Sequence, residues 1–365
     1  MRIISIEPIP IAIPYRHEGP LTGFGGSVWP TLRYLLVRVE TEDGLVGWGE
    51  AFGYSVIPAT AAVIRETLAP LAIGRDASIV AGLMEELKKT LHIYGRGGST
   101  QYAIGGLDIA LWDLAGKRAR CPLAELLGGI GRASIDAYSS LMRLTDPDIV
   151  RRGCERARQK GFRAVKLHEI TEPAVAAARE ALGDDIPLMV DVNCAWRPDE
   201  AVTMARSLER HRLTWLEEPI WPPEDLASLQ RLRAASDTPL AAGENIPNAW
   251  AFKPFAESHA LDYLQPSVTK VGGITEFMKV ANMAEFHGKR IAPHSPYFGP
   301  GLLATIQIAA ACPLIGRIEC FGVELESPLY GSIGLPDTNG MFVVPTSPGL
   351  GMDPDPDVLK RVKVT

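Results

Sequence analysis

Residues 188–196, LMVDVNCAW, place a carboxylate directly after a run of apolar residues. A buried strand gains nothing from a charge at its end, so Asp191 requires an explanation. The same pattern recurs in LTWLEEP, where Glu217 and Glu218 follow an apolar run, and in PLAAGEN, where Glu244 does. Three such endings in one part of the chain indicate a common cause.

Apolar runs with polar ends recur at a nearly constant spacing from about residue 133 onward. Counted between the polar residues that mark them, successive runs lie 23 to 27 positions apart. These landmarks are Lys166, Asp191, Glu217, Glu244, Ser267, His294 and Glu319. A spacing of about 25 residues accommodates a short strand, a loop, a helix and a return loop.

Helical patterns fill intervals between these runs, at 147–160, 172–182 and 198–210. Alternating strands and helices predict a parallel sheet. Eight strands, with IDAYSSLM as the first, favour a closed (β/α)₈-type barrel over an open sheet. No G-x-G-x-x-G follows a strand, which argues against dinucleotide binding. We therefore predict an α/β protein whose barrel occupies residues 131–330.

The first 130 residues have a different pattern, which predicts a separate α+β domain over 1–130. The opening MRIISIEPIPIAIPYR is interrupted by prolines and predicts an extended strand, not a signal peptide. The segment TLRYLLVRVETEDGLVGWGEA alternates on both sides of Glu42, Asp43 and Gly44, as in a hairpin. Helical patterns follow at about 57–70, 78–91 and 100–119.

Composition excludes several classes of partner. A net charge of −6 and a pI near 5.7 argue against nucleic acid or an anionic membrane as a partner. The five cysteines are odd in number and form no CxxC pair, which favours a reducing compartment and argues against disulfides or a zinc site. No apolar stretch approaches the roughly 20 residues of a membrane span. We expect a cytoplasmic protein.

In a barrel of this type the active site lies at the carboxyl ends of the strands, where the polar landmarks recur. A single carboxylate after a strand is more often a helix cap or a solvated loop residue. A whole ring of polar residues in phase with the strands favours a site.

Asp191, Glu217 and Glu244 come from three consecutive strands, and their charges would repel one another strongly at one barrel mouth. A divalent cation removes that repulsion. Carboxylates without a nearby thiolate select Mg²⁺ over zinc. The sequence therefore predicts a Mg²⁺ site, with Asn193 on the strand face of Asp191 as a possible substrate contact.

Lys166 and His168 are two residues apart on a strand, so their side chains point to the same face. If that face is the inside of the barrel, the metal and a second cation would lower the pKa of Lys166 and make it a usable base. The alternative is a lysine whose amine extends to solvent with no catalytic role.

Together these stretches resemble the enolase superfamily, of the mandelate racemase and muconate-lactonizing enzyme type. The matching motifs are AIGGLDIALWDLAGKRARCPLAELLGG at 103–129, VKLH at 165–168, VDVN at 190–193, EEP at 217–219, GEN at 243–245, KVGG at 270–273 and PHSPYFGPG at 293–301. The resemblance covers essentially the whole chain. It implies an α+β capping domain, a modified TIM barrel of the form (β/α)₇β, and a C-terminal segment, 331–365, that returns to the cap.

The resemblance also implies a reaction, namely removal of the proton next to a carboxylate. Mg²⁺ on the three acidic residues would stabilise an enediolate. Lys166 matches the first lysine of the racemase Lys-x-Lys pattern, and His168 replaces the second. His294 matches the histidine of a His-Asp dyad, and Glu319 matches a glutamate that binds the substrate carboxylate.

Two positions depart from the family pattern, Ser267 in the dyad and His168 in the Lys-x-Lys pattern. The dyad aspartate falls at Ser267, where muconate-lactonizing relatives carry a lysine. We expect the Ser267 hydroxyl to orient His294 directly and, because it brings no charge, to leave His294 more often neutral than a dyad histidine. His168 is either a second catalyst on the lysine's side or a substrate contact.

Substrate specificity is expected from capping loops near 15–30 and 50–58. The candidate contacts there are Arg16, His17, Trp29 and Tyr54. Arg16 or His17 could meet hydroxyls or a second carboxylate. The aromatic residues just past strand ends that could form the pocket wall are Trp196, Trp221, Tyr297 and Phe298.

We predict a Mg²⁺-dependent lyase or isomerase that acts on a small-molecule carboxylate and forms a homo-oligomer. The preferred reaction is dehydration of a hydroxylated acid, an acid sugar. Lys166 takes the α-proton, and His294 or His168 assists departure of the β-hydroxyl. The alternatives are a racemase or epimerase and a non-catalytic, metal-dependent acid-binding protein, the latter suggested by the missing dyad acid.

Overall fold

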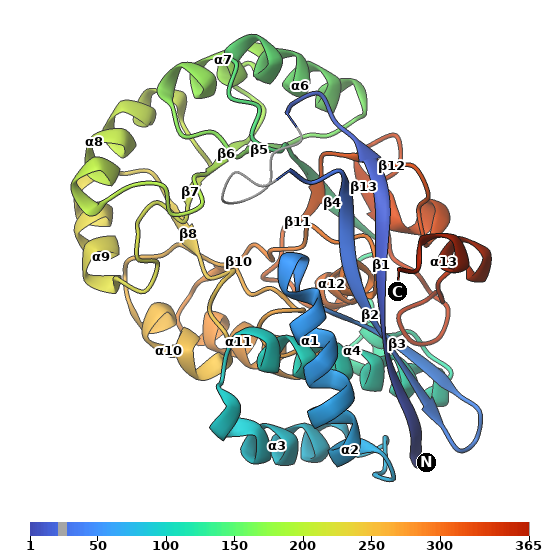
Figure 1. Cartoon of the computed structure of the whole chain (residues 1–365). Coiled ribbons are helices and arrows are strands. Elements are labelled where there is room, and N and C mark those ends of the chain that lie inside the picture. Colours follow the sequence, from blue (N-terminus) through green and yellow to red (C-terminus); the bar gives the residue numbers. More distant parts are fainter. Residues whose placement is uncertain (21–27, 365) are drawn as a thin grey trace.

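The computed structural model describes residues 1–20 and 28–364, and its centre is a barrel of parallel strands (Figure 1). The strands are β4 (Ser134–Ser140), β5 (Val165–Leu167), β6 (Leu188–Asp191), β7 (Trp215–Glu217), β8 (Leu240–Ala242), β9 (Tyr263–Leu264), β10 (Arg290–Ile291) and β11 (Arg317–Phe321). Each pairs in parallel with its neighbour in chain order from β4 to β10, and β11 pairs with β4. β10 and β11 are joined by a single parallel bridge between Ile291 and Ile315, which closes the barrel.

Helices lie between successive strands and form the outer layer of the barrel (Figure 1). They are α6 (Pro147–Gln159), α7 (Glu172–Leu182), α8 (Pro198–Leu208), α9 (Leu226–Ala235), α10 (Ala249–Glu257), α11 (Ile274–Phe286) and α12 (Pro300–Ala311). Eight strands with seven helices between them, in the described residues, confirm the predicted (β/α)₇β barrel. All eight strands fall on the predicted apolar runs.

Local sequence explains where several barrel helices begin and end. Proline opens α6 and α8 at the first helical position and α7 at the second, where its missing N–H leaves no bond unmade. Asp146 precedes α6 and accepts from the backbone N–H of Asp148 and Ile149. Gly183 ends α7 with a φ of 70°.

The cap combines an antiparallel sheet with a layer of helices. Its strands are β1 (Ile3–Arg16), β2 (Thr31–Thr41), β3 (Val46–Ala51) and β12 (Glu324–Leu325), in the order β12-β1-β2-β3. Its helices are α1 (Ile57–Val63), a π-helical turn (Ile64–Leu68), α2 (Ala69–Ala72), α3 (Val80–Leu91) and α4 (Gly98–Ala119). The predicted hairpin and helical regions are confirmed, although a π-helical turn interrupts the region predicted at 57–70.

Close backbone contact between α4 and β3 depends on glycine. A Cβ at Gly49 would overlap the carbonyl of Gly106, and one at Gly47 would overlap the carbonyl of Ala110. The alternation of glycine in VGWGEA therefore reflects helix–strand packing.

The C-terminal region connects cap and barrel. After β11, β12 joins β1 of the cap, and β13 (Met341–Val343) then pairs antiparallel with β4 of the barrel. The last helix, α13 (Pro356–Val362), leads to Lys363, which bridges to Ile11 of β1. The chain thus returns to the cap. The predicted boundary at 330 does not separate the parts, because β12 before it pairs with the cap and β13 after it pairs with the barrel.

No helix in the described parts of the chain combines the length and the apolar character needed to cross a membrane.

A first prediction concerns the stability of the barrel. Arg179 of α7 is 9% exposed, and its guanidinium donates to four carbonyls, those of Gly183, Ile186, His211 and Arg212. Arg179→Met leaves those carbonyls without a donor and should lower the free energy of unfolding by about 3 kcal/mol. Denaturant unfolding measures the change.

Two further variants interpret that result. Arg179→Lys keeps the positive charge but not the planar set of guanidinium N–H donors, so we expect about half of the loss in unfolding free energy seen for Arg179→Met. Arg206→Met is the matched control, because Arg206 is exposed and donates to one carbonyl, that of Ala235. It should cost no more than about 0.5 kcal/mol. Equal losses for Arg179→Met and Arg206→Met would show that the buried guanidinium does not stabilise this region.

Candidate active site

Side chains on neighbouring barrel strands bring the predicted acidic residues together. Asp191 ends β6 and Glu217 ends β7, and the two are register partners in the parallel sheet. Glu244 follows β8 two residues past its end. All three are buried, with exposed fractions of 0%, 0% and 7%. The strand periodicity therefore places three carboxylates in one layer of the barrel mouth.

The three carboxylates fit a divalent cation. One oxygen from each of Asp191, Glu217 and Glu244 lies within 4.8 Å of the others. Asp191 Oδ2 is buried and forms no hydrogen bond with the described residues, although His168 Nε2 and Lys166 Nζ lie 3.3 and 3.6 Å from it. A cation bound at this oxygen would satisfy it more fully than these ion-pair contacts do. Three hard oxygen donors suit Mg²⁺.

Lys166 lies in the barrel, directed toward the acidic residues. It is 1% exposed, and its Nζ lies 2.9 Å from Glu217, 3.0 Å from Glu319 and 3.6 Å from Asp191. Burial lowers the pKa of Lys166, but the carboxylates of Glu217 and Glu319 outweigh burial and hold that pKa well above its usual value. This direction holds for the metal-free site, where the nearest charges are negative. The expected lowering depends on a cation bound at those same carboxylates, and it stays a prediction.

His168 shares the face of Lys166, as the two-residue spacing predicted. Its Nδ1 lies 2.6 Å from the carbonyl of Leu141, which can only accept, so Nδ1 carries a proton. Its Nε2 lies 3.3 Å from Asp191 Oδ2. Burial lowers the pKa of His168, and the contact with Asp191 outweighs it, so the pKa is raised.

His294 approaches the acidic group from β10. Its Nε2 lies 3.1 Å from Glu244 Oε2. Burial lowers the pKa of His294 to about 4, in spite of the Glu244 carboxylate. This direction agrees with the expectation of a neutral imidazole.

The expected contact between Ser267 and His294 is wrong, because a tyrosine stands between them. Ser267 Oγ hydrogen-bonds the Tyr297 hydroxyl, which lies 3.2 Å from His294 Nδ1. Ser267 is 1% exposed and does not line the cavity, so it is not placed to touch substrate there. Tyr297, which we expected in the pocket wall, instead contacts His294 at Nδ1, the ring nitrogen that does not face Glu244.

Glu319 is fixed by donors on both of its oxygens. Ser140 Oγ lies 2.6 Å from Oε1, and the backbone N–H of Ser295 lies 2.9 Å from Oε2. Burial raises the pKa of Glu319, but Lys166 and His294 outweigh it and lower that pKa to about 2.

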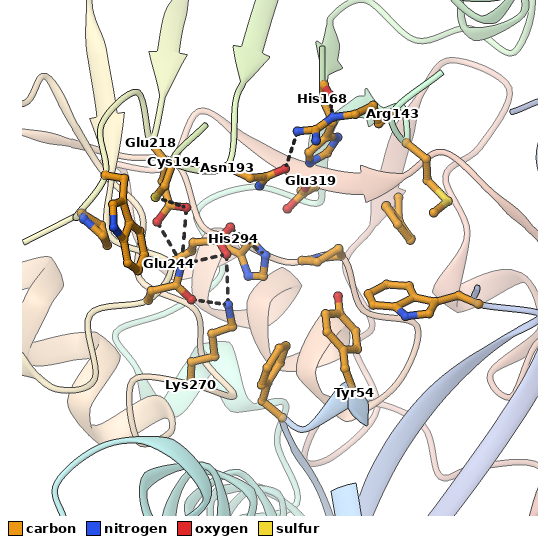
Figure 2. Close-up of a pocket in the computed structure, with 18 of the residues that line it drawn as sticks. Tyr54, Arg143, His168, Asn193, Cys194, Glu218, Glu244, Lys270, His294 and Glu319 are labelled. Atoms are coloured by element: carbon orange, nitrogen blue, oxygen red, sulfur yellow. Dashed lines mark hydrogen bonds and ion pairs between the residues drawn. The ribbon is translucent and has the colours of Figure 1, made fainter. Parts of the chain in front are cut away.

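A cavity of about 730 Å³ lies over these residues (Figure 2). Its polar lining is Arg143, His168, Asn193, Cys194, Glu218, Glu224, Glu244, Asn245, Lys270, His294 and Glu319. Trp29, Phe52 and Tyr54 of the cap and Trp221 of the barrel supply aromatic surface. The volume is within the range of small-molecule sites.

The predicted substrate contacts divide into two groups. Tyr54 and Asn193 line this cavity, as expected. Arg16 and His17 do not, and that expectation is wrong for the described structure, since both line a neighbouring cavity of about 500 Å³. The Arg16 side chain is 80% exposed and pairs with Glu326. Residues 21–27 of the predicted capping loop lie outside the described residues.

The aromatic wall was predicted only in part. Trp221 lines the cavity, whereas Trp196, Tyr297 and Phe298 are buried outside its lining. A short residue pattern past a strand end cannot show whether a ring faces the mouth or the helix layer.

Six polar residues of the lining were not predicted as contacts, namely Arg143, Cys194, Glu218, Glu224, Asn245 and Lys270. Lys270 donates to Glu244 and Asn245 and lies over the Phe52 ring, which connects a predicted metal ligand to the cap. Glu218, the second residue of the EEP motif, accepts from Asn245. Arg143 follows β4 in a loop, where no periodicity marks it.

Comparison with known proteins places this site in a family. Residues 149–358 match the domain described as "Enolase C-terminal domain-like". Residues 20–128 match "Mandelate racemase / muconate lactonizing enzyme, N-terminal domain". Together the two matches span most of the chain.

Individual proteins are similar over nearly the whole length. D-galactarolactone cycloisomerase of Agrobacterium fabrum is 33% identical, over 91% of this chain and 91% of the relative. L-talarate/galactarate dehydratase of Salmonella typhimurium is 32% identical, over 90% and 82%. The crystal structure of a racemase from Streptomyces coelicolor with bound magnesium superposes with a TM-score of 0.88 at 30% identity, over 99% of this chain and all of the other.

Proposed function

The chain belongs to the mandelate racemase and muconate lactonizing enzyme family of the enolase superfamily, and from that premise we propose that it eliminates a β-substituent from an acid sugar. It is an enzyme of the lyase or isomerase type, as its relatives are dehydratases and cycloisomerases. The non-catalytic alternative therefore falls away. The reaction and the substrate are our proposal.

The observation that carries the proposal is the position of Lys166 beside the acidic group. Its Nζ contacts Glu217 and Asp191 on one side of that group, and His294 contacts Glu244. A substrate carboxylate bound at the acidic residues would present its α-carbon between a lysine and a histidine. This is the geometry that general-base removal of an α-proton requires.

Each residue then has one task. Asp191, Glu217 and Glu244 would hold Mg²⁺, whose positive charge would stabilise the negative charge that develops on the substrate carboxylate. Lys166 Nζ takes the α-proton. Glu319, fixed by Ser140 and Ser295, contacts the substrate carboxylate, and this contact requires that Glu319 be protonated when substrate is bound. His168, whose pKa is raised, is better suited than the neutral His294 to deliver a proton to the leaving oxygen.

Dehydration is the first choice, and ring opening is the second. In dehydration the leaving oxygen is a β-hydroxyl, and water departs. In ring opening it is a ring oxygen that stays in the product, which is then an isomer of the substrate. The second reaction is included because D-galactarolactone cycloisomerase is among the relatives. Racemisation by two bases loses support, because Ser267 supplies no carboxylate and reaches His294 only through Tyr297.

A screen of acid sugars and their lactones in D₂O with Mg²⁺ tests this proposal. Mass spectrometry should show loss of water for dehydration. For ring opening it should show an isomer of the substrate that has gained one deuterium, located at the β-carbon, because the enol left by elimination takes up a solvent deuteron there as it becomes a 2-keto acid. Exchange of the α-proton with no other change would indicate racemisation or epimerisation. No exchange and no product with any acid sugar would refute the proposal.

A further inference from the structure

Arg143 is the one guanidinium among the described residues that line the barrel-mouth cavity. It follows β4 by three residues, and its side chain lies beside His168 and Asn193 (Figure 2). Its Nε donates to the carbonyl of His168 at 2.6 Å. Its Nη2 lies 3.5 Å from Asn193 Oδ1. Both acceptors are neutral, and none of the carboxylates in the described parts of the chain forms an ion pair with Arg143.

The other cations at this mouth are already paired. Lys166 contacts Glu217 and Glu319, and Lys270 contacts Glu244. A partly buried cation without an anion has lost hydration and gained no charge partner. Arg143 is therefore the cation of this cavity whose charge is available to pair with a ligand anion.

The contact with Asn193 determines which groups face the cavity. With its Oδ1 turned to Arg143, the Asn193 amide presents its N–H groups elsewhere, and the guanidinium keeps Nη1 and one N–H of Nη2 for other partners. This patch of the lining offers donors and no acceptor. Two parallel N–H groups at the end of a guanidinium match the two oxygens of a carboxylate.

The patch lies past the strand ends, whereas Asp191 and Glu217 are the last residues of their strands. Asn193 is two residues past Asp191, and its backbone N–H donates to Asp191 Oδ1 at 2.8 Å. Arg143 is three residues past Ser140, which holds Glu319. The reacting carboxylate of a substrate belongs to the deeper layer, so a group bound at Arg143 is at a different part of the molecule.

Resting on the proposed function, we propose that Arg143, with the Asn193 amide, binds a second carboxylate at the far end of the substrate. The substrates are then dicarboxylic acid sugars, and monocarboxylic sugar acids of the same length are poor substrates.

The test compares matched pairs of acid sugars that differ only at the remote end, carboxylate against primary alcohol; galactarate and galactonate are one pair. Arg143→Met should lower kcat/KM for the dicarboxylate about 100-fold, the effect of losing a charge-assisted pair, and change that for the alcohol less than about threefold. Arg143→Lys keeps the charge without the fork and should fall between. Arg163→Met is the matched control, because Arg163 is exposed and pairs with Asp136.

The outcomes separate the two proposals. Equal losses for both members of a pair, or a wild-type preference for the alcohol, would overturn the role of Arg143 and leave the elimination reaction standing. If wild type converts no acid sugar, the elimination proposal fails, and calorimetric binding of the same pair with Mg²⁺ still decides the inference. Weaker binding of galactarate alone in Arg143→Met supports it, and unchanged binding overturns it.

Discussion

Asp191→Asn should reduce turnover at least about 10³-fold, because a Mg²⁺ held there would supply several kcal/mol of charge stabilisation and each 1.36 kcal/mol is tenfold. The amide keeps the shape of the carboxylate, so the fold should survive. Glu217→Gln and Glu244→Gln should behave alike, since each would supply an oxygen to the same ion. Chelation of wild type should remove activity and added Mg²⁺ restore it.

Thermal unfolding supplies a readout that does not depend on turnover. Mg²⁺ at 100 times its dissociation constant should stabilise wild type by about 2.7 kcal/mol, and Asp191→Asn by much less. The matched control is Asp136→Asn, at the opposite end of barrel strand β4, where Asp136 pairs with Arg163 and Arg317. It should keep both activity and the Mg²⁺ response. Full activity of metal-free wild type, or an unchanged Mg²⁺ response in Asp191→Asn, would remove Mg²⁺ from these residues.

The acidic cluster could be predicted because the strand period and the residue chemistry agree there. Strands of a parallel barrel end at one mouth, so the carboxylates that follow them come close together. The sheet register sets Asp191 beside Glu217, whereas Glu217 pairs with Ala241 and Glu244 reaches the cluster from the loop after β8. The same reasoning placed Lys166 and His168 on one face.

Residues beyond the strand ends follow no such rule. Ser267 and His294 both follow strands, yet whether they touch depends on the loop that carries Tyr297 between them. Arg143 lies in a loop whose course no periodicity specifies. Arg16 ends a long strand of the cap, and its direction depends on how the cap rests on the barrel, which the sequence of either part does not contain.

Lys166→Met should slow exchange of the substrate α-proton about 10³-fold, within the range for loss of a general base. Methionine keeps the length of the side chain without the amine. Metal binding should persist, since the substitution removes a cation that lies 2.9 Å from Glu217 and 3.6 Å from Asp191. Two carboxylates freed from that cation should hold Mg²⁺ at least as tightly.

Two further variants test whether Lys166 acts as a base or only through its positive charge. Lys166→Arg keeps a positive charge at the same place, but a guanidinium does not release its proton at neutral pH, so exchange should remain as slow as in Lys166→Met. Lys270→Met removes another buried lysine of the same mouth, one that donates to Glu244 and Asn245. It should cost no more than about tenfold, because it removes hydrogen bonds and no base. NMR of the α-proton in D₂O measures exchange in all three. Exchange near the wild-type rate in Lys166→Met would transfer the base to His168, which follows the same strand and contacts Asp191, or to His294, which follows β10 and contacts Glu244.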